Sequence, residues 1–212
     1  MDDVLSRLSR LLQEGDDAGI RDLTRDAIAR RIPPRDILSA LLAGMALVGE
    51  RFRDHEIFLP DVLLSARAMH AAMTLLKPLL VAHGIPPQGT VVLGTVAGDL
   101  HDVGKNLVAI MLQGAGFEII DLGTDVPPDR FVDAAIEGGA RIIGLSALLT
   151  TTMVRMKEVV DLIEHRGLHG RLLTIVGGAP VTEEFAREIG ADSYGFDAAS
   201  AVQRVRALLD RA

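Results

Sequence analysis

The chain has 212 residues, 49% of them hydrophobic and only 3% aromatic, and carries a formal net charge of -7. This length allows one domain or two small ones, and the apolar fraction suffices for a globular core of aliphatic side chains. The acidic balance argues against a surface that neutralises phosphates, so we expect no nucleic-acid partner. The lack of cysteine excludes disulfides, thiolate zinc sites and iron–sulfur clusters.

The N-terminus, residues 1–12, mixes charged residues with leucines at helical spacing, unlike the basic and then apolar pattern of a signal peptide. No stretch reaches the roughly 18 to 20 unbroken apolar residues that a membrane span needs. We therefore expect a soluble, cytoplasmic protein with no membrane partner.

Apolar residues recur three and four positions apart through the first half of the chain, which is the spacing of amphipathic helices. Pro34 and Pro60 fit the first turns of two such helices, because proline lacks only an N–H that has no helical partner there. A glycine- and proline-rich linker follows at 81–89. We expect a four-helix bundle over residues 1–85, with helices ending near 12, running from 17 to about 30, opening at 33–34, and running from 60 to about 80.

After the linker, short apolar runs alternate with amphipathic runs, as in a parallel sheet wound on both faces. The apolar runs show no polar alternation, which is expected where helices cover both faces of the sheet. Residues 90–212 are therefore predicted to form a flavodoxin-like or Rossmann-like α/β domain with five strands. The predicted strands are 90–97, 117–122, 141–146, 172–176 and 193–195, with helices at 103–113, from about 129, and after the later strands.

Polar or glycine-rich segments follow three of the predicted strands. They are 98–104 after the first, 146–152 after the third and 177–179 after the fourth. Parallel doubly wound sheets bind ligands at the carboxyl ends of their strands, near the point where the strand order reverses. The sequence thus predicts a ligand site where these three segments meet.

Several common ligands do not fit the first of these segments. Gly104-Lys105-Asn106 suggests a phosphate loop, but the spacing from Gly98 is one residue too long, and Asn106 stands where Ser or Thr would bind magnesium. The pattern G-x-G-x-x-G of dinucleotide sites is absent. A flavin site would need aromatic residues, and the chain has a single tyrosine.

Asp99 and His101 remain, two positions apart on a tight turn. A metal-bound histidine usually donates its second ring N–H to a carboxylate, so the pair suits a metal ligand and its partner. Taken alone, His101 is better interpreted as a loop histidine that caps a helix, because one histidine and one aspartate are weak evidence for a metal site. Asp121 and Asp125 are interpreted as turn or cap residues.

The segments taken together resemble the signature of cobalamin-binding domains. The signature consists of Asp99-x-His101-x-x-Gly104, then Ser146-x-Leu148, then Gly177-Gly178. The first half of the chain also resembles the helical cap of methionine synthase, in residues 48–52 and 57–60. The resemblance covers essentially the whole chain.

The resemblance implies a cobalamin or related corrinoid cofactor, with methylcobalamin as the loaded state. It makes His101 the axial cobalt ligand. Asp99 then accepts the second ring N–H of His101, and Ser146 completes this hydrogen-bonded relay. Phe52 and Leu59 match the cap residues that shield the upper cobalt face. Leu38 stands where the cap of methionine synthase has a cofactor-contacting glutamate. The other implied cofactor contacts are Gly98, Leu100, Asp102, Gly104, Leu148, Thr150, Gly177, Gly178 and Ala199.

The resemblance further implies the cofactor-carrying component of a corrinoid-dependent methyltransferase system. Such a carrier shuttles a methyl group from a substrate:corrinoid methyltransferase to a corrinoid:acceptor methyltransferase that uses a folate or thiol acceptor. A reductive activator is a further implied partner. The alternative is a cobalamin-dependent sensor, but such proteins usually carry a DNA-binding domain before the cap. The small subunit of a mutase would lack the cap.

Overall fold

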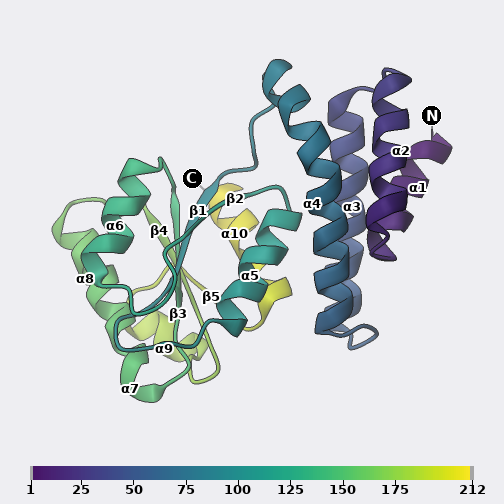
Figure 1. The fold of residues 1–212 in the computed structure, drawn as a ribbon. Helices are drawn as coiled ribbons and strands as arrows, with labels where there is room; N and C mark the ends of the chain where they lie inside the picture. Colours follow the sequence, from purple (N-terminus) through teal and green to yellow (C-terminus); the bar gives the residue numbers. More distant parts are fainter. Residues whose placement is uncertain (1, 211–212) are drawn as a thin grey trace. The chain divides into compact units, whose positions relative to one another are not determined.

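Four helices form the first part of the chain in the computed structural model, which describes residues 2–210 (Figure 1). Leucines and isoleucines from all four are fully buried, among them Leu8, Ile20, Leu41 and Leu76, as the three- and four-residue spacing predicts. The predicted four-helix arrangement is confirmed. The helices are α1 Asp2–Gln13, α2 Asp17–Ala29, α3 Pro34–Arg53 and α4 Leu59–Ala82.

The helix starts follow from local hydrogen bonds. The Asp16 carboxylate accepts a hydrogen bond from the Gly19 N–H at 2.9 Å, which caps α2. The Asp61 carboxylate reaches back to accept from the Phe58 N–H at 2.9 Å at the start of α4. Pro34 occupies the first turn of α3, where its missing N–H leaves no helical bond unmade.

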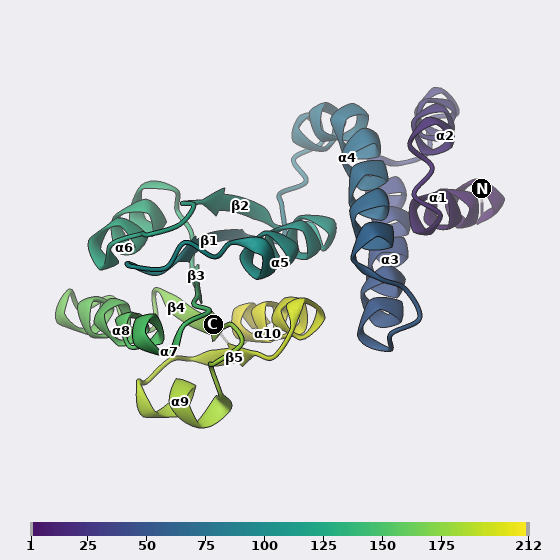
Figure 2. The same ribbon diagram turned by 60° about the horizontal axis from the view of Figure 1, so that its bottom comes forward.

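The rest of the chain forms a five-stranded parallel sheet in the order β2-β1-β3-β4-β5 (Figures 1 and 2). Helices α6 and α8 pack on one face, and α5 and α10 lie on the other. The predicted doubly wound parallel sheet is confirmed. The strands are β1 Thr90–Thr95, β2 Glu118–Asp121, β3 Ile142–Ser146, β4 Leu173–Gly177 and β5 Ser193–Gly195, and the helices are α5 Val103–Gly114, α6 Pro128–Glu137, α7 Thr150–Met153, α8 Arg155–His165, α9 Glu183–Glu188 and α10 Ala198–Asp210.

The chain divides into two compact units. The helical unit comprises Met1–Pro87 with Gly114–Gly116, and the sheet unit comprises Gln88–Gln113 with Phe117–Ala212. In the described part of the chain, no helix is both long and apolar enough to cross a membrane.

The strand order reverses between β1 and β3, because the chain leaves β1 for β2 on one side and later returns to β3 on the other. The last residues of three strands lie in register, with Thr95 opposite Ser146 and Ser146 opposite Gly177. The segments that follow β1, β3 and β4 therefore leave the sheet at the same level. This is the edge where the topology predicts a ligand site.

Candidate functional site

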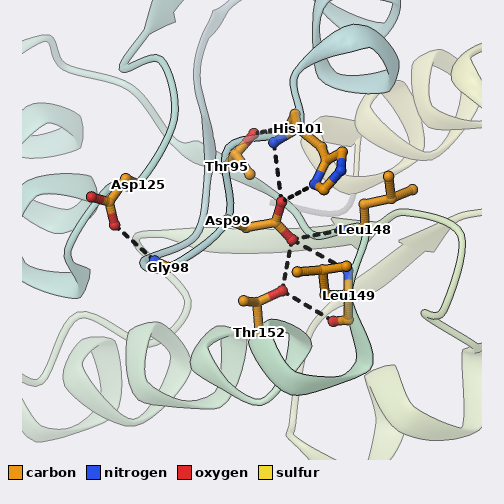
Figure 3. A network of polar contacts seen from close by, with 8 residues as sticks. All are labelled: Thr95, Gly98, Asp99, His101, Asp125, Leu148, Leu149 and Thr152. Atoms are coloured by element: carbon orange, nitrogen blue, oxygen red, sulfur yellow. Dashed lines mark hydrogen bonds and ion pairs between the residues drawn. The ribbon is translucent and has the colours of Figure 1, made fainter.

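The loop between β1 and α5 holds His101 at the surface and Asp99 beneath it (Figure 3). The chain turns at Gly98, whose φ of 81 lies in the left-handed region that favours glycine. The Asp99 side chain is 0% exposed, whereas the His101 side chain is 52% exposed. The buried Thr95 hydroxyl donates to the His101 carbonyl at 2.8 Å and fixes the loop backbone. The imidazole is thus accessible to a ligand, and the backbone of its loop is fixed by the hydrogen bond from Thr95.

The Asp99 carboxylate joins the loop after β1 to the segment after β3 (Figure 3). Its Oδ1 accepts from the His101 ring Nδ1 at 2.7 Å and from the His101 backbone N–H at 3.1 Å. Its Oδ2 accepts from the Leu148 and Leu149 backbone N–H groups at 2.8 and 3.3 Å. The Thr152 hydroxyl donates to the same Oδ2 at 2.6 Å. Both oxygens of a fully buried carboxylate are therefore satisfied.

These contacts determine the charge of Asp99. Burial raises the pKa of the Asp99 carboxyl, but hydrogen bonds from Thr152, Leu148 and His101 outweigh burial and hold the pKa well below its usual range. The group is therefore an ionised carboxylate, which only accepts hydrogen bonds. It follows that Nδ1 of His101 carries a proton. In a neutral imidazole, Nε2 then has a free lone pair, which is the state in which histidine binds metals.

Thr152 is the hydroxyl residue that the sequence analysis did not identify. The resemblance to cobalamin-binding domains makes Ser146 the relay hydroxyl, but the structure places the Thr152 hydroxyl against Asp99. Ser146 is the last residue of β3, and its carbonyl accepts from the Val96 N–H at 3.0 Å. Thr152 lies in α7 and is 7% exposed. Four hydroxyl residues fall within 146–152, and periodicity alone does not select among them.

Gly177 and Gly178 follow β4 at the same edge of the sheet. Gly178 has a φ of 128, and a Cβ added there would lie 1.8 Å from the Ala147 carbonyl oxygen. At Gly177 an added Cβ would lie 3.0 Å from the Gly195 carbonyl oxygen. Close backbone approach, rather than contact with a ligand alone, requires glycine at position 178.

Replacing Gly178 with alanine is expected to destabilise the chain by about 3 kcal/mol, because the new methyl group forces both an overlap and an unfavourable φ. Urea unfolding followed by circular dichroism measures this change. Gly123→Ala is the matched control, since Gly123 has a φ of 80 but open space around an added Cβ. An equal loss in both variants would show that φ, and not the Ala147 contact, determines the cost.

The other residues expected at the site occupy several positions. Leu100 is 73% exposed beside His101, and Leu148 and Thr150 are also exposed. Asp102 accepts a hydrogen bond from the Asn106 side chain at 3.0 Å. Gly104 has open space around an added Cβ. Ala199 is buried at the start of α10. Within the helical unit, Phe52 near the end of α3 and Leu59 at the start of α4 are half-buried.

The protein has a parallel doubly wound sheet, and a histidine oriented by a carboxylate lies at the switch point, where the strand order reverses. This arrangement is typical of a ligand-binding α/β protein. The chain belongs to the B12 binding domain family: one family model described as B12 binding domain matches residues 89–203, and a second of the same description matches residues 4–77. Cobalamin or a related corrinoid is therefore the cofactor of this protein.

Three similar proteins have names that mention a corrinoid or cobalamin. Trimethylamine corrinoid protein 1 of Methanosarcina mazei is 39% identical over 211 residues, which cover 98% of each chain. A cobalamin-binding protein from Desulfitobacterium hafniense is 34% identical with a TM-score of 0.80, covering 96% of this chain and 98% of that chain. One chain in the structure of the methanol:cobalamin methyltransferase complex MtaBC of Methanosarcina barkeri is 31% identical with a TM-score of 0.89, and the match covers 100% of this chain and 81% of that chain.

The residues at the edge of the sheet fit a corrinoid. A corrinoid brings its own bound metal, so the protein would need to add one donor atom from a side chain. His101 is an exposed imidazole whose ring orientation is fixed by a buried carboxylate, as a metal-ligating histidine requires. Exposed apolar side chains such as Leu100 and Leu148 flank it and suit the body of a large organic ring.

Proposed function

We propose that this chain carries a methyl group on a protein-bound corrinoid, between a substrate:corrinoid methyltransferase and a corrinoid:acceptor methyltransferase that uses a folate or thiol acceptor. The observation that carries the proposal is the His101–Asp99 pair at the switch point of the sheet. Similarity to a trimethylamine corrinoid protein and to the MtaBC complex supports a methyltransferase system as its setting. A reductive activator is a further expected partner.

His101 is proposed to bind cobalt through Nε2. When bound, the corrinoid supplies a cobalt ion that accepts a methyl group and passes it on, and the protein provides binding and orientation. Asp99 accepts the Nδ1 proton and thereby keeps Nε2 free for the metal. Because the ring is 52% exposed, Nε2 would be accessible to a corrinoid bound at this edge of the sheet.

Thr152 is proposed to hold the carboxylate that orients the histidine. Its hydroxyl donates to Asp99 and accepts nothing from it, since an ionised carboxylate has no proton to give. The hydroxyl fixes Oδ2 on the side opposite His101, so that Oδ1 stays aimed at the ring. Ser146 remains a proposed contact of the cofactor at the end of β3.

We assign residues 90–212 to the cofactor and residues 1–85 to a cap. Phe52 and Leu59 of the cap are proposed to shield the upper face of the metal. The residues proposed to contact the cofactor or its tail are Gly98, Leu100, Asp102, Gly104, Leu148, Thr150, Gly177, Gly178 and Ala199.

Methyl transfer in a reconstituted system tests the proposal. The chain is loaded with hydroxocobalamin, reduced, and mixed with candidate methyltransferases and methanol, methylamines or methoxylated compounds. With one of these pairs, the visible spectrum is expected to convert to that of methylcobalamin. A second methyltransferase is then expected to move the methyl group to tetrahydrofolate or to a thiol. The control is the same mixture without the first methyltransferase.

A different result would support a cobalamin-dependent sensor. If the loaded protein accepts no methyl group and releases an upper ligand only on illumination, the chain is a sensor rather than a carrier. That result would be compatible with corrinoid binding but would contradict the proposed role in methyl transfer.

A further inference from the structure

Lys105 is a buried cation in the first turn of α5, four residues after His101. It is 3% exposed. Its Nζ donates to both carboxylate oxygens of Asp121 at 2.6 Å and to the Asn106 side-chain oxygen at 2.8 Å. Position and burial both oppose this charge, because the helix macrodipole disfavours a cation at an N-terminus and desolvation penalises it. The ion pair therefore needs an explanation other than helix stability.

Asp125, in the loop between β2 and α6, makes a second contact with the segment around His101. Its carboxylate accepts from the Gly98 N–H at 2.7 Å (Figure 3). The Asp125 N–H donates to the Asp99 carbonyl at 3.0 Å. Asp125 has a φ of 55, in the left-handed region that aspartate, asparagine and glycine adopt more readily than other residues. In this conformation its side chain binds the loop after β1.

The β2–α6 loop is itself fixed to the sheet. The Gly123 N–H donates to Asp121 at 2.9 Å, the Thr95 N–H donates to the Gly123 carbonyl at 2.9 Å, and the Val126 N–H donates to the Thr95 carbonyl at 3.0 Å. Asp121 and Asp125 are therefore presented from a rigid support.

Asp121 at the end of β2 and Asp125 in the loop that follows it hold the two ends of the segment that presents His101. Asp125 binds Gly98, three residues before the histidine, and Asp121 binds Lys105, four residues after it. We propose that Asp121, Asp125 and Lys105 form a clamp that positions His101 for cobalt, so that loosening either end weakens coordination by the imidazole. They are positioning residues, and the inference rests on the proposed role of His101 as the axial ligand.

The test measures coordination directly and needs no partner enzyme. The chain is produced with [15N]histidine, loaded with cobalamin and reduced to cobalt(II). In electron paramagnetic resonance, a 15N ligand splits the cobalt lines into doublets, whereas unlabelled nitrogen from the cofactor or from added imidazole gives triplets. Unlabelled imidazole is then titrated, and the concentration that removes half of the doublet reports how firmly the protein holds its histidine on the metal.

Asp125→Gly and Lys105→Met loosen the two ends separately. Glycine tolerates the left-handed φ and removes the acceptor for Gly98, while methionine keeps the length of the buried side chain. Lys105→Met leaves the Asp121 carboxylate 41% exposed and able to reach water, so the fold is expected to survive. In each variant the imidazole midpoint, which is the imidazole concentration that removes half of the doublet, is expected to fall about fivefold. This is the order of change that a lost hydrogen bond produces.

Asp125→Asn is the matched control. Asparagine also tolerates the left-handed φ, and its amide oxygen still accepts from the Gly98 N–H, so the midpoint is expected to stay at the wild-type value. Circular dichroism of the apo chains checks that each variant folds.

The outcomes separate the two inferences. If His101→Ala keeps the doublet, the ligand assignment is wrong and the clamp has nothing to position. If His101→Ala loses the doublet while folded Asp125→Gly and Lys105→Met both keep the wild-type midpoint, the clamp alone is overturned. A lowered midpoint in Asp125→Asn equal to that of Asp125→Gly also overturns it, because the hydrogen bond would then not matter.

Discussion

Replacing His101 with alanine is expected to abolish nitrogen coordination by the protein to bound cobalt while leaving the fold intact. The side chain is 52% exposed, so truncation opens no cavity in the core. Asp99 keeps the His101 backbone N–H, both backbone donors after β3 and the Thr152 hydroxyl as partners. The free energy of unfolding of the apo chain is expected to change by no more than about 1 kcal/mol.

The measurement is the [15N]histidine doublet of the cobalt(II) form, which should vanish in His101→Ala. The labelled chain holds six histidines, so the control replaces another one of the sheet unit. His169→Ala is suitable because its side chain is 68% exposed and lies near Glu164, away from the β1–α5 loop in the sequence. The doublet is expected to persist there. A doublet that survives His101→Ala would show that a different histidine binds the metal.

The fold could be predicted from the sequence because its periodicities are strong. Spacings of three and four in the first half and unbroken apolar runs in the second half correspond to elements whose bounds differ from prediction by a few residues. The first strand ends at Thr95 rather than at residue 97, since Gly98 turns the chain with a positive φ. The meeting of the segments after β1, β3 and β4 followed from the parallel topology alone.

The partners of Asp99 could not be predicted in full for a physical reason. The contact from Asp99 to Thr152 spans 53 positions and depends on how α7 is oriented after β3, which no local spacing encodes. The same holds for Asp121, which contacts Lys105 of the preceding helix, 16 positions earlier, and looks like an ordinary turn aspartate in the sequence. Hydrogen bonds between loops follow from the folded geometry, whereas helices and strands follow from local patterns.

Asp99→Asn is expected to fold but to lose coordination by His101. The single amide oxygen can satisfy the donors from Leu148 and Thr152, or the Nδ1–H of His101, but not both sides at once. The first arrangement satisfies more donors and turns the amide NH2 toward the ring. Nδ1 must then accept, so the proton of the neutral imidazole moves to Nε2 and occupies the atom that would bind cobalt.

The [15N]histidine doublet is therefore expected to be absent from Asp99→Asn at neutral pH although the chain still unfolds cooperatively. Asp125→Asn, which makes the same chemical change on the adjoining loop, is the control and should retain the doublet. Asp99→Ala removes every acceptor and leaves the Leu148 N–H and the Thr152 hydroxyl buried without this partner, so it is expected to destabilise the chain by about 4 kcal/mol. If Asp99→Asn retains the full doublet, the carboxylate does not set the tautomer of His101. Its hydrogen bonds would then serve only to join the segments that follow β1 and β3.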